Sequence, residues 1–82
     1  MFLVGIDIGK NKHSFCIIEK ETGELIVKPK FFGNNNIGFE ELISSIQNLS
    51  NQDILIGMED TGHYHFALLK FLLDKKYQVA LI

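Results

Sequence analysis

Three short apolar runs near the N-terminus predict β-strands. The first, Phe2 to Ile8, is apolar except for Gly5 and Asp7, a pattern typical of a central strand covered on both faces. Two further runs, His13 to Glu19 and Leu25 to Lys30, follow after the short polar segments GKNK and KETGE. Because connections this short join antiparallel neighbours, the three runs predict a meander of three strands.

Two longer segments have the spacing of amphipathic helices. The first helix is expected from Ile37 to Leu49, after a GNNN loop that offers an asparagine as its N-cap. The second is expected from Tyr64 to about Lys76, with Thr61 as its cap. Its core-facing stripe is expected to be Ala67, Leu68, Phe71 and Leu72. Each helix is followed by a further predicted strand, Ile54 to Met58 and Gln78 to Ile82.

The order β-β-β-α-β-α-β predicts an α/β fold. Right-handed crossovers add the fourth and fifth strands parallel to the first, which gives a mixed five-stranded sheet of order 3-2-1-4-5 with helices packed on it. Pro29 suits an edge strand because proline has no N–H to donate. This is the ribonuclease-H-like arrangement, which does not by itself fix a function. We expect residues 1–82 to form one partial domain of a longer protein, because the chain stops within the apolar run YQVALI.

Composition limits the class of protein and the cellular compartment that we expect for this domain. Hydrophobic residues make up 46% of the chain, which favours a folded globule, but no run is long enough to span a membrane. The single cysteine, Cys16, and the absence of a leader sequence are typical of the reducing cytoplasm. Eight lysines, no arginine and ten acids give a net charge of −2, so we expect any nucleic-acid contact to need basic surface from elsewhere.

Two acidic residues interrupt or end apolar strands. Asp7 lies near the end of the first strand and Glu59 directly follows the fourth, so the predicted topology brings both to the carboxyl edge of the sheet. Two buried carboxylates raise each other's pKa unless a cation lies between them, and oxygen ligands favour Mg²⁺ or Mn²⁺. The alternatives are that Asp7 caps the turn at residues 9–11 and that Glu59 belongs to a solvated loop.

The two stretches together resemble the N-terminal domain of the DEDD insertion-sequence transposases, a family that includes Piv-like DNA invertases. GIDIGK matches the pattern G-[IV]-D-x-x-K through Gly5, Asp7 and Lys10. EDTGHYH matches E-x-T-G-x-Y through Glu59, Thr61, Gly62 and Tyr64, and the resemblance covers nearly the whole chain.

This resemblance implies a RuvC-like fold and a metal-dependent recombinase. Asp7 and Glu59 would be the first two of four catalytic acids that bind Mg²⁺ or Mn²⁺, while the other two lie beyond the last strand. The whole protein would cut and join DNA during transposition, with a guide RNA in some members. A homo-oligomer is expected separately, because the predicted edge strands at Leu25 to Lys30 and Gln78 to Ile82 leave unpaired backbone groups. Because only half of the acids are present, we expect residues 1–82 to be inactive alone.

Two further motif residues are candidates for substrate binding. Lys10 follows the aspartate strand and can meet a phosphate as a point charge; the alternative is a solvated turn lysine. Tyr64 can position the substrate or stack on a base; the alternative, more frequent for such a tyrosine, is that it packs the helix start against the sheet.

Two other function classes share the predicted architecture. Actin-like ATPases and sugar kinases also begin with a GIDIG-like strand, in which Asp7 and Gly9 would handle Mg-ATP; they usually place a serine or threonine soon after the second glycine, where this chain has Lys10 and Asn11. A non-catalytic oligomerisation module is the other alternative, because two predicted edge strands leave unpaired backbone groups.

Overall fold

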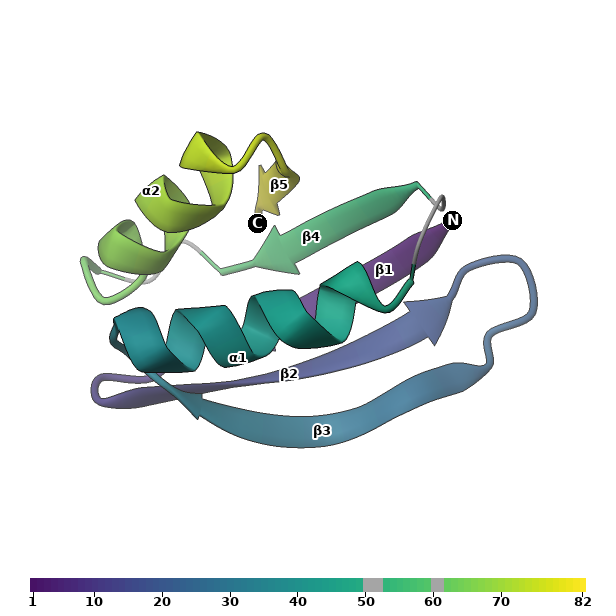
Figure 1. The fold of residues 1–82 in the computed structure, drawn as a ribbon, viewed down its shortest axis with the longest axis horizontal. Helices are drawn as coiled ribbons and strands as arrows, with labels where there is room; N and C mark the ends of the chain where they lie inside the picture. Colours follow the sequence, from purple (N-terminus) through teal and green to yellow (C-terminus); the bar gives the residue numbers. More distant parts are fainter. Residues whose placement is uncertain (50–52, 60–61) are drawn as a thin grey trace.

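The computed structural model describes residues 1–49, 53–59 and 62–82 as a five-stranded sheet with two helices (Figure 1). The strands are β1 (Phe2–Asp7), β2 (Lys12–Glu19), β3 (Leu25–Gly33), β4 (Ile54–Met58) and β5 (Gln78–Leu81), and the helices are α1 (Asn36–Gln47) and α2 (Phe66–Asp74). The strand order is β3-β2-β1-β4-β5; β1 is antiparallel to β2 and parallel to β4. The predicted ribonuclease-H-like topology is confirmed.

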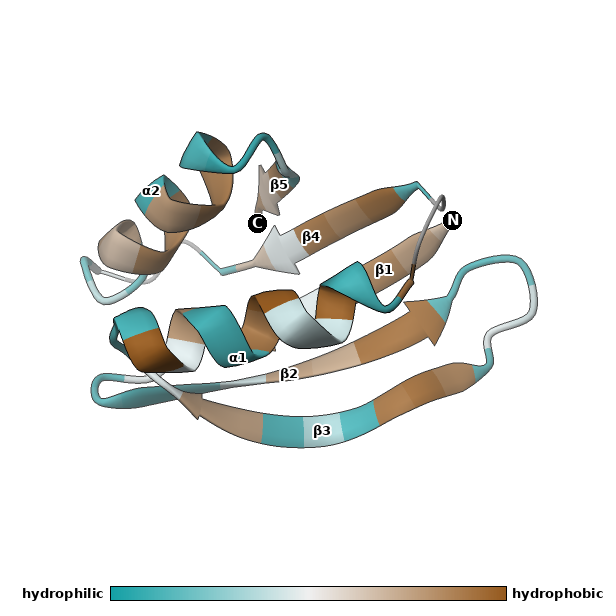
Figure 2. Cartoon of the chain, in the orientation of Figure 1, coloured by the Kyte–Doolittle hydropathy of each residue, from teal (hydrophilic) through white to brown (hydrophobic). Residues whose placement is uncertain are grey.

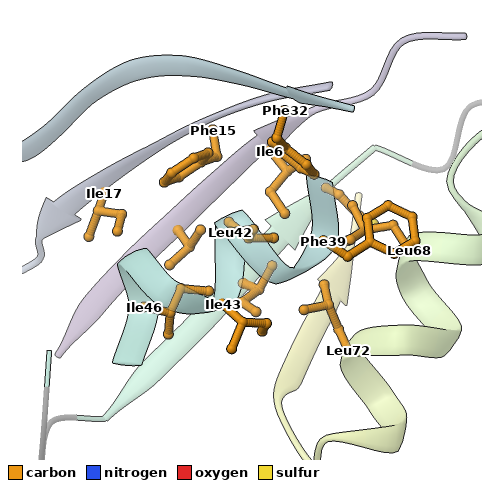
Figure 3. Close-up of a cluster of buried hydrophobic side chains, with 13 residues drawn as sticks. Ile6, Phe15, Ile17, Phe32, Phe39, Leu42, Ile43, Ile46, Leu68 and Leu72 are labelled. Atoms are coloured by element: carbon orange, nitrogen blue, oxygen red, sulfur yellow. The ribbon is translucent and has the colours of Figure 1, made fainter. Parts of the chain in front are cut away.

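Both helices pack on one face of the sheet, here called the helical face. The crossovers from β1 to β4 and from β4 to β5 step in the same direction, so right-handed connections place α1 and α2 on the same side. Figure 3 shows side chains of the two helices pointing toward those of the sheet. The residues labelled there are Ile6, Phe15, Ile17 and Phe32 of the sheet, Phe39, Leu42, Ile43 and Ile46 of α1, and Leu68 and Leu72 of α2.

The opposite face of the sheet, here called the outer face, is open in the part of the chain that the structure describes. On β1, Val4 and Ile6 are buried beneath the helices, whereas Gly5 and Asp7 are exposed on the other side. The prediction that this strand is covered on both faces is therefore wrong for the described residues. Strand alternation places every second side chain on this open face.

Strand β3 is longer than predicted, because it continues through Pro29 to Gly33 instead of ending at Lys30. Proline is tolerated here because β3 is an edge strand of the sheet. The added residues include Phe32, which is buried and paired with His13 of β2. Figure 2 shows the resulting pattern, with apolar ends and a more hydrophilic middle. Burial of Phe32 therefore extends the strand beyond the polar segment.

Helix α1 begins at Asn36, one residue before the predicted start at Ile37, and ends earlier than predicted. The Asn35 side chain accepts a hydrogen bond of 2.8 Å from the Gly38 backbone N–H, which makes Asn35 the N-cap. The helix ends at Gln47, two residues before the predicted Leu49. No helix within the described residues is long and apolar enough to cross a membrane.

Helix α2 is shorter than predicted at both ends. It begins at Phe66 after a turn over residues 62–65, so the predicted start at Tyr64 is wrong, and the predicted cap, Thr61, lies outside the described residues. Ala67 is exposed and does not join Leu68 and Leu72 in the core. At the other end Lys76 adopts a left-handed conformation (φ 71°), and the N–H groups of Lys76 and Tyr77 bond to carbonyl groups of the last helical turn.

Candidate functional site

Asp7 and Glu59 occupy matching positions on neighbouring strands. Asp7 is the last residue of β1 and Glu59 directly follows β4, and the residues before them, Ile6 and Met58, are paired in the parallel register. Because Ile6 and Met58 are buried on the helical face, the acids that follow them belong to the outer face. Both acids are exposed and line one hollow of about 500 Å³, here called the carboxylate hollow. The structure thus brings the two predicted acids together.

The carboxylate hollow is open because small residues form its floor. Gly5 and Gly57 are paired across β1 and β4, and Cys16 is the partner of Gly5 on β2. A Cβ atom on Gly57 would have no neighbour within 4 Å, and one on Gly5 would meet only the Cys16 Sγ atom, at 3.7 Å. A group can therefore approach the backbone closely beside the two acids.

The acids are exposed rather than buried, which corrects the picture of two carboxylates withdrawn from water. Their chemistry fits a hard divalent cation, because carboxylate oxygens on adjacent strands are the donors that Mg²⁺ and Mn²⁺ prefer. Within residues 1–49, 53–59 and 62–82, no group of three or more His, Cys, Asp or Glu side chains is placed to hold a metal. Asp7 and Glu59 are thus suited to be part of a cation site and not the whole of one.

A second hollow adjoins the first on the same face, and we call it the aromatic hollow. It has a volume of about 410 Å³, and its lining includes Asp7, Lys10, Lys12, Ser14 and Phe31. Asp7 and Ser14 line both hollows, so the two form one continuous depression. The sheet register explains the continuity, because Asp7 is paired with Ser14 and Ser14 with Phe31. Paired residues share a face, so these three form one row across the outer face.

The two candidate substrate-binding residues lie in turns at the same edge of the sheet. Lys10 is exposed in the β1–β2 turn and lines the aromatic hollow. Tyr64 lies in the turn before α2, its side chain is 38% exposed, and it lines neither hollow. Its ring lies beside that of His63, with centroids 4.7 Å apart. Lys10 therefore lies in the same hollow as Asp7, whereas Tyr64 lies in a turn outside both hollows.

Asn34 connects these two turns. Its side-chain Nδ2 donates hydrogen bonds to the carbonyl oxygens of Lys10 (3.3 Å) and Tyr64 (3.4 Å). Its backbone N–H donates to the Asn11 carbonyl at 3.1 Å. One residue at the end of β3 therefore fixes both motif-bearing turns relative to each other.

His13 supports the β1–β2 turn from below. Its side chain is buried, and its Nδ1 accepts a hydrogen bond of 3.1 Å from the Gly9 backbone N–H. This bond assigns the proton of the neutral ring to Nε2. Burial lowers the pKa of His13, while Asn34 and the negative charge of Asp7 act in the opposite direction. Gly9 is required because a Cβ atom there would collide with the Lys12 carbonyl oxygen.

Other motif residues have structural explanations or lie outside the described residues. Gly62 has φ 58°, a conformation that favours glycine. Asp60 and Thr61 lie outside the described residues. Asp74 is the last residue of α2, is exposed, and pairs with Lys70 at 2.8 Å; it lines neither hollow.

Sequence reasoning missed the contributions of Asn34, His13 and Phe31. Asn34 lies in the GNNN loop, where one asparagine is enough to cap the helix, so the sequence gives it no separate role. His13 lies in a predicted apolar strand, and nothing in the sequence distinguishes it from the other residues of that strand. Phe31 fell beyond the predicted end of its strand. A signal did exist for Phe31, because two adjacent aromatic residues after a proline favour continuation of a strand.

The family model of the DEDD insertion-sequence transposases, described as a transposase, matches residues 4–82. No curated protein matches the chain.

Among solved structures, RuvC of T. thermophilus in complex with a Holliday junction substrate is similar, with a TM-score of 0.64 and 10% identity over 100% of this chain and 64% of that one. The Holliday junction resolvase of fowlpox virus is similar with a TM-score of 0.60 and 11% identity; the match covers 100% of this chain and 60% of that one. A Ppx/GppA phosphatase of Aquifex aeolicus is similar with a TM-score of 0.50 and 14% identity; the match covers 100% of this chain and 35% of that one. The chain thus spans less than two thirds of the length of these structures, and the likeness establishes the RuvC-like, ribonuclease-H-like fold.

Proposed function

Because the chain belongs to the DEDD insertion-sequence transposases, we propose that it is the N-terminal part of a recombinase that cuts and joins DNA strands with a divalent metal. Family membership favours this function over the actin-like ATPase or sugar-kinase alternative. The similarity to two Holliday junction proteins supports the same fold for the whole catalytic domain. The function of this segment is to supply the first half of the catalytic site.

One observation carries the proposal. Asp7 and Glu59, distant in sequence, follow paired positions on parallel strands and line one hollow on the open face. A turn cap or a solvated loop would require no such agreement between two separate strands. The proposal assigns both residues as catalytic metal ligands.

In this mechanism Asp7 and Glu59 would hold Mg²⁺ or Mn²⁺ through their carboxylate oxygens. When bound, the metal supplies charge stabilisation to the phosphodiester group undergoing cleavage. Lys10 would bind a neighbouring phosphate oxygen with its ammonium group, and Tyr64 would orient the strand at the rim. The glycine floor would allow the DNA backbone, or a further acidic residue of the longer protein, to approach closely.

The partners of the whole protein follow from the same proposal. DNA is the substrate, and a guide RNA is a further expectation of family membership. A homo-oligomer is expected from the unpaired edge strands, and a cytoplasmic location from the single cysteine. The net charge of −2 supports a division of labour in which other parts of the protein supply most of the DNA affinity.

The test is a Mn²⁺ titration of this chain followed by NMR, in which the paramagnetic ion broadens nearby amide signals. We expect broadening centred on residues 5–9 and 57–59 in the wild type and its loss in Asp7→Asn and Glu59→Gln. In a protein that also carries the remaining acids, each change should reduce cleavage by about 100-fold or more, because changes to residues that only orient metal ligands already cost about 10–100-fold.

The matched control is Glu40→Gln, which removes an exposed carboxylate from α1 without touching the hollow. It should leave both the broadening and the cleavage unchanged. Survival of metal binding and cleavage in both site variants would refute the assignment. Tight ATP binding by the longer protein without any DNA cleavage would favour the kinase-like alternative instead.

A further inference from the structure

Phe31 is an exposed aromatic residue at the end of the row that begins with Asp7. Its side chain is 65% exposed, although its neighbour Phe32 is buried in the core. The register places Phe31 beside Ser14, and Ser14 beside Asp7, on the outer face. A large apolar side chain therefore lies in the same depression as a proposed catalytic acid, two strands away from it.

The surroundings of Phe31 are basic. The Lys12 Nζ atom lies 4.3 Å from the centroid of the Phe31 ring, in the geometry of a cation–π interaction. Lys10 lines the same hollow. Two ammonium groups and an aromatic face thus adjoin one carboxylate, in a chain whose overall charge is negative. This local concentration of positive charge is complementary to a phosphate backbone.

We propose that the aromatic hollow is a binding subsite for an unpaired nucleotide, in which a base stacks on Phe31 and Lys12 binds an adjacent phosphate. This inference rests on the proposed function and adds to it the place where the strand lies next to Asp7. Stacking suits the site because every base has an apolar face, so the ring binds a strand without reading its sequence. An unpaired nucleotide fits better than a duplex, because bases in a duplex are already stacked.

The sheet register also sets the distance between the stacked base and the proposed catalytic acid. The row Asp7–Ser14–Phe31 crosses three neighbouring strands, each about 4.8 Å from the next, so roughly 10 Å separates the acid from the ring. This is the scale of one to two nucleotides. The base held by Phe31 is therefore expected close to the phosphate that is cut.

The test uses an eight-nucleotide oligothymidine with a 5′ fluorescein and one 5-iodouracil, at low salt and with EDTA so that no cleavage occurs. Fluorescence anisotropy gives the affinity, and ultraviolet cross-linking followed by peptide mass spectrometry locates the stacked base. We expect the cross-link at Phe31 and a loss of affinity of about 5-fold or more in Phe31→Ala, with recovery in Phe31→Tyr. Lys12→Gln should make the slope of log affinity against log salt shallower by about 0.7.

The matched control is Leu25→Ala, which shortens an exposed apolar side chain at the opposite end of the same strand. Its affinity should equal that of the wild type. Wild-type affinity in Phe31→Ala, or a cross-link formed elsewhere, would overturn the subsite. A loss of cleavage in Asp7→Asn together with normal binding in Phe31→Ala would leave the recombinase function intact and refute only the subsite. Absence of oligonucleotide binding in every variant, with Mn²⁺ binding retained, would refute the subsite as well.

Discussion

At the scale of single residues, the site depends on polar groups that the motifs do not contain. The motif letters include Asp7, Lys10, Glu59 and Tyr64, but the turns that carry Lys10 and Tyr64 are joined through Asn34. The sequence identified the acids because a carboxylate at the end of an apolar strand is unusual. It could not identify Asn34, because that residue's bonding partners are 24 and 30 residues away.

His13 is expected to make stability depend on pH. Burial lowers its pKa in the folded chain below the ordinary value of 6.5, so the unfolded chain binds a proton first as the pH falls. This contribution to stability is complete above pH 6.5 and is lost as the pH falls below it, by at most about 1.4 kcal/mol per pH unit. Urea unfolding between pH 7.5 and 5.5 should therefore show a steeper loss in the wild type than in His13→Asn, whose side chain does not titrate. Equal slopes for the two proteins would contradict the assignment.

At the scale of elements, local sequence patterns predict the strands and helices, but they do not predict where two elements approach each other closely. The first turn of α1 lies against the end of β3, where a Cβ atom on Gly38 would collide with the backbone of Gly33. Helical spacing predicted α1 to within one residue at its start and two residues at its end. The sequence could not predict that position 38 of this helix requires glycine. The requirement comes from Gly33 at the end of β3, and the predicted strand ended at Lys30.

Gly38→Ala is accordingly expected to destabilise the fold although alanine is the better helix former by about 1 kcal/mol. The collision with the Gly33 backbone should outweigh this gain and give a net loss of about 1–3 kcal/mol in the free energy of unfolding. The control is Gly57→Ala, where the added methyl group meets nothing within 4 Å. It should leave stability unchanged or raise it by at most about 1 kcal/mol. Chemical denaturation measures both, and a more stable Gly38→Ala protein would disprove the close approach.

At the scale of the whole molecule, the sheet has one face that is open among the described residues and two differently protected edges. The β3 edge carries Lys28, Pro29 and Lys30, which are residues that discourage pairing with another strand. The β5 edge is short but apolar, with Leu81 44% exposed. Any edge-to-edge association of two copies is therefore expected through β5 rather than β3.

Leu81→Lys should weaken this self-association by placing a charge on the β5 edge. Light scattering at increasing protein concentration is expected to show a rising mass for the wild type and a constant monomer mass for the variant. Leu73→Lys, at an exposed position on α2, is the control and should associate as the wild type does. A wild-type protein that stays monomeric at high concentration would rule out edge pairing. An equal loss of self-association in both variants would indicate non-specific hydrophobic association instead.

The sequence by itself determined the order of the elements, the sheet topology and the two candidate acids. These depend on the spacing of apolar residues and on short motifs, which are local along the chain. Only the tertiary structure decided that one face of the sheet is open among the described residues, that Phe31 lies in line with Asp7, and that Asn34 joins two turns. Each of these relations links residues from different elements, and such links are set by strand register and by the side on which the helices pack.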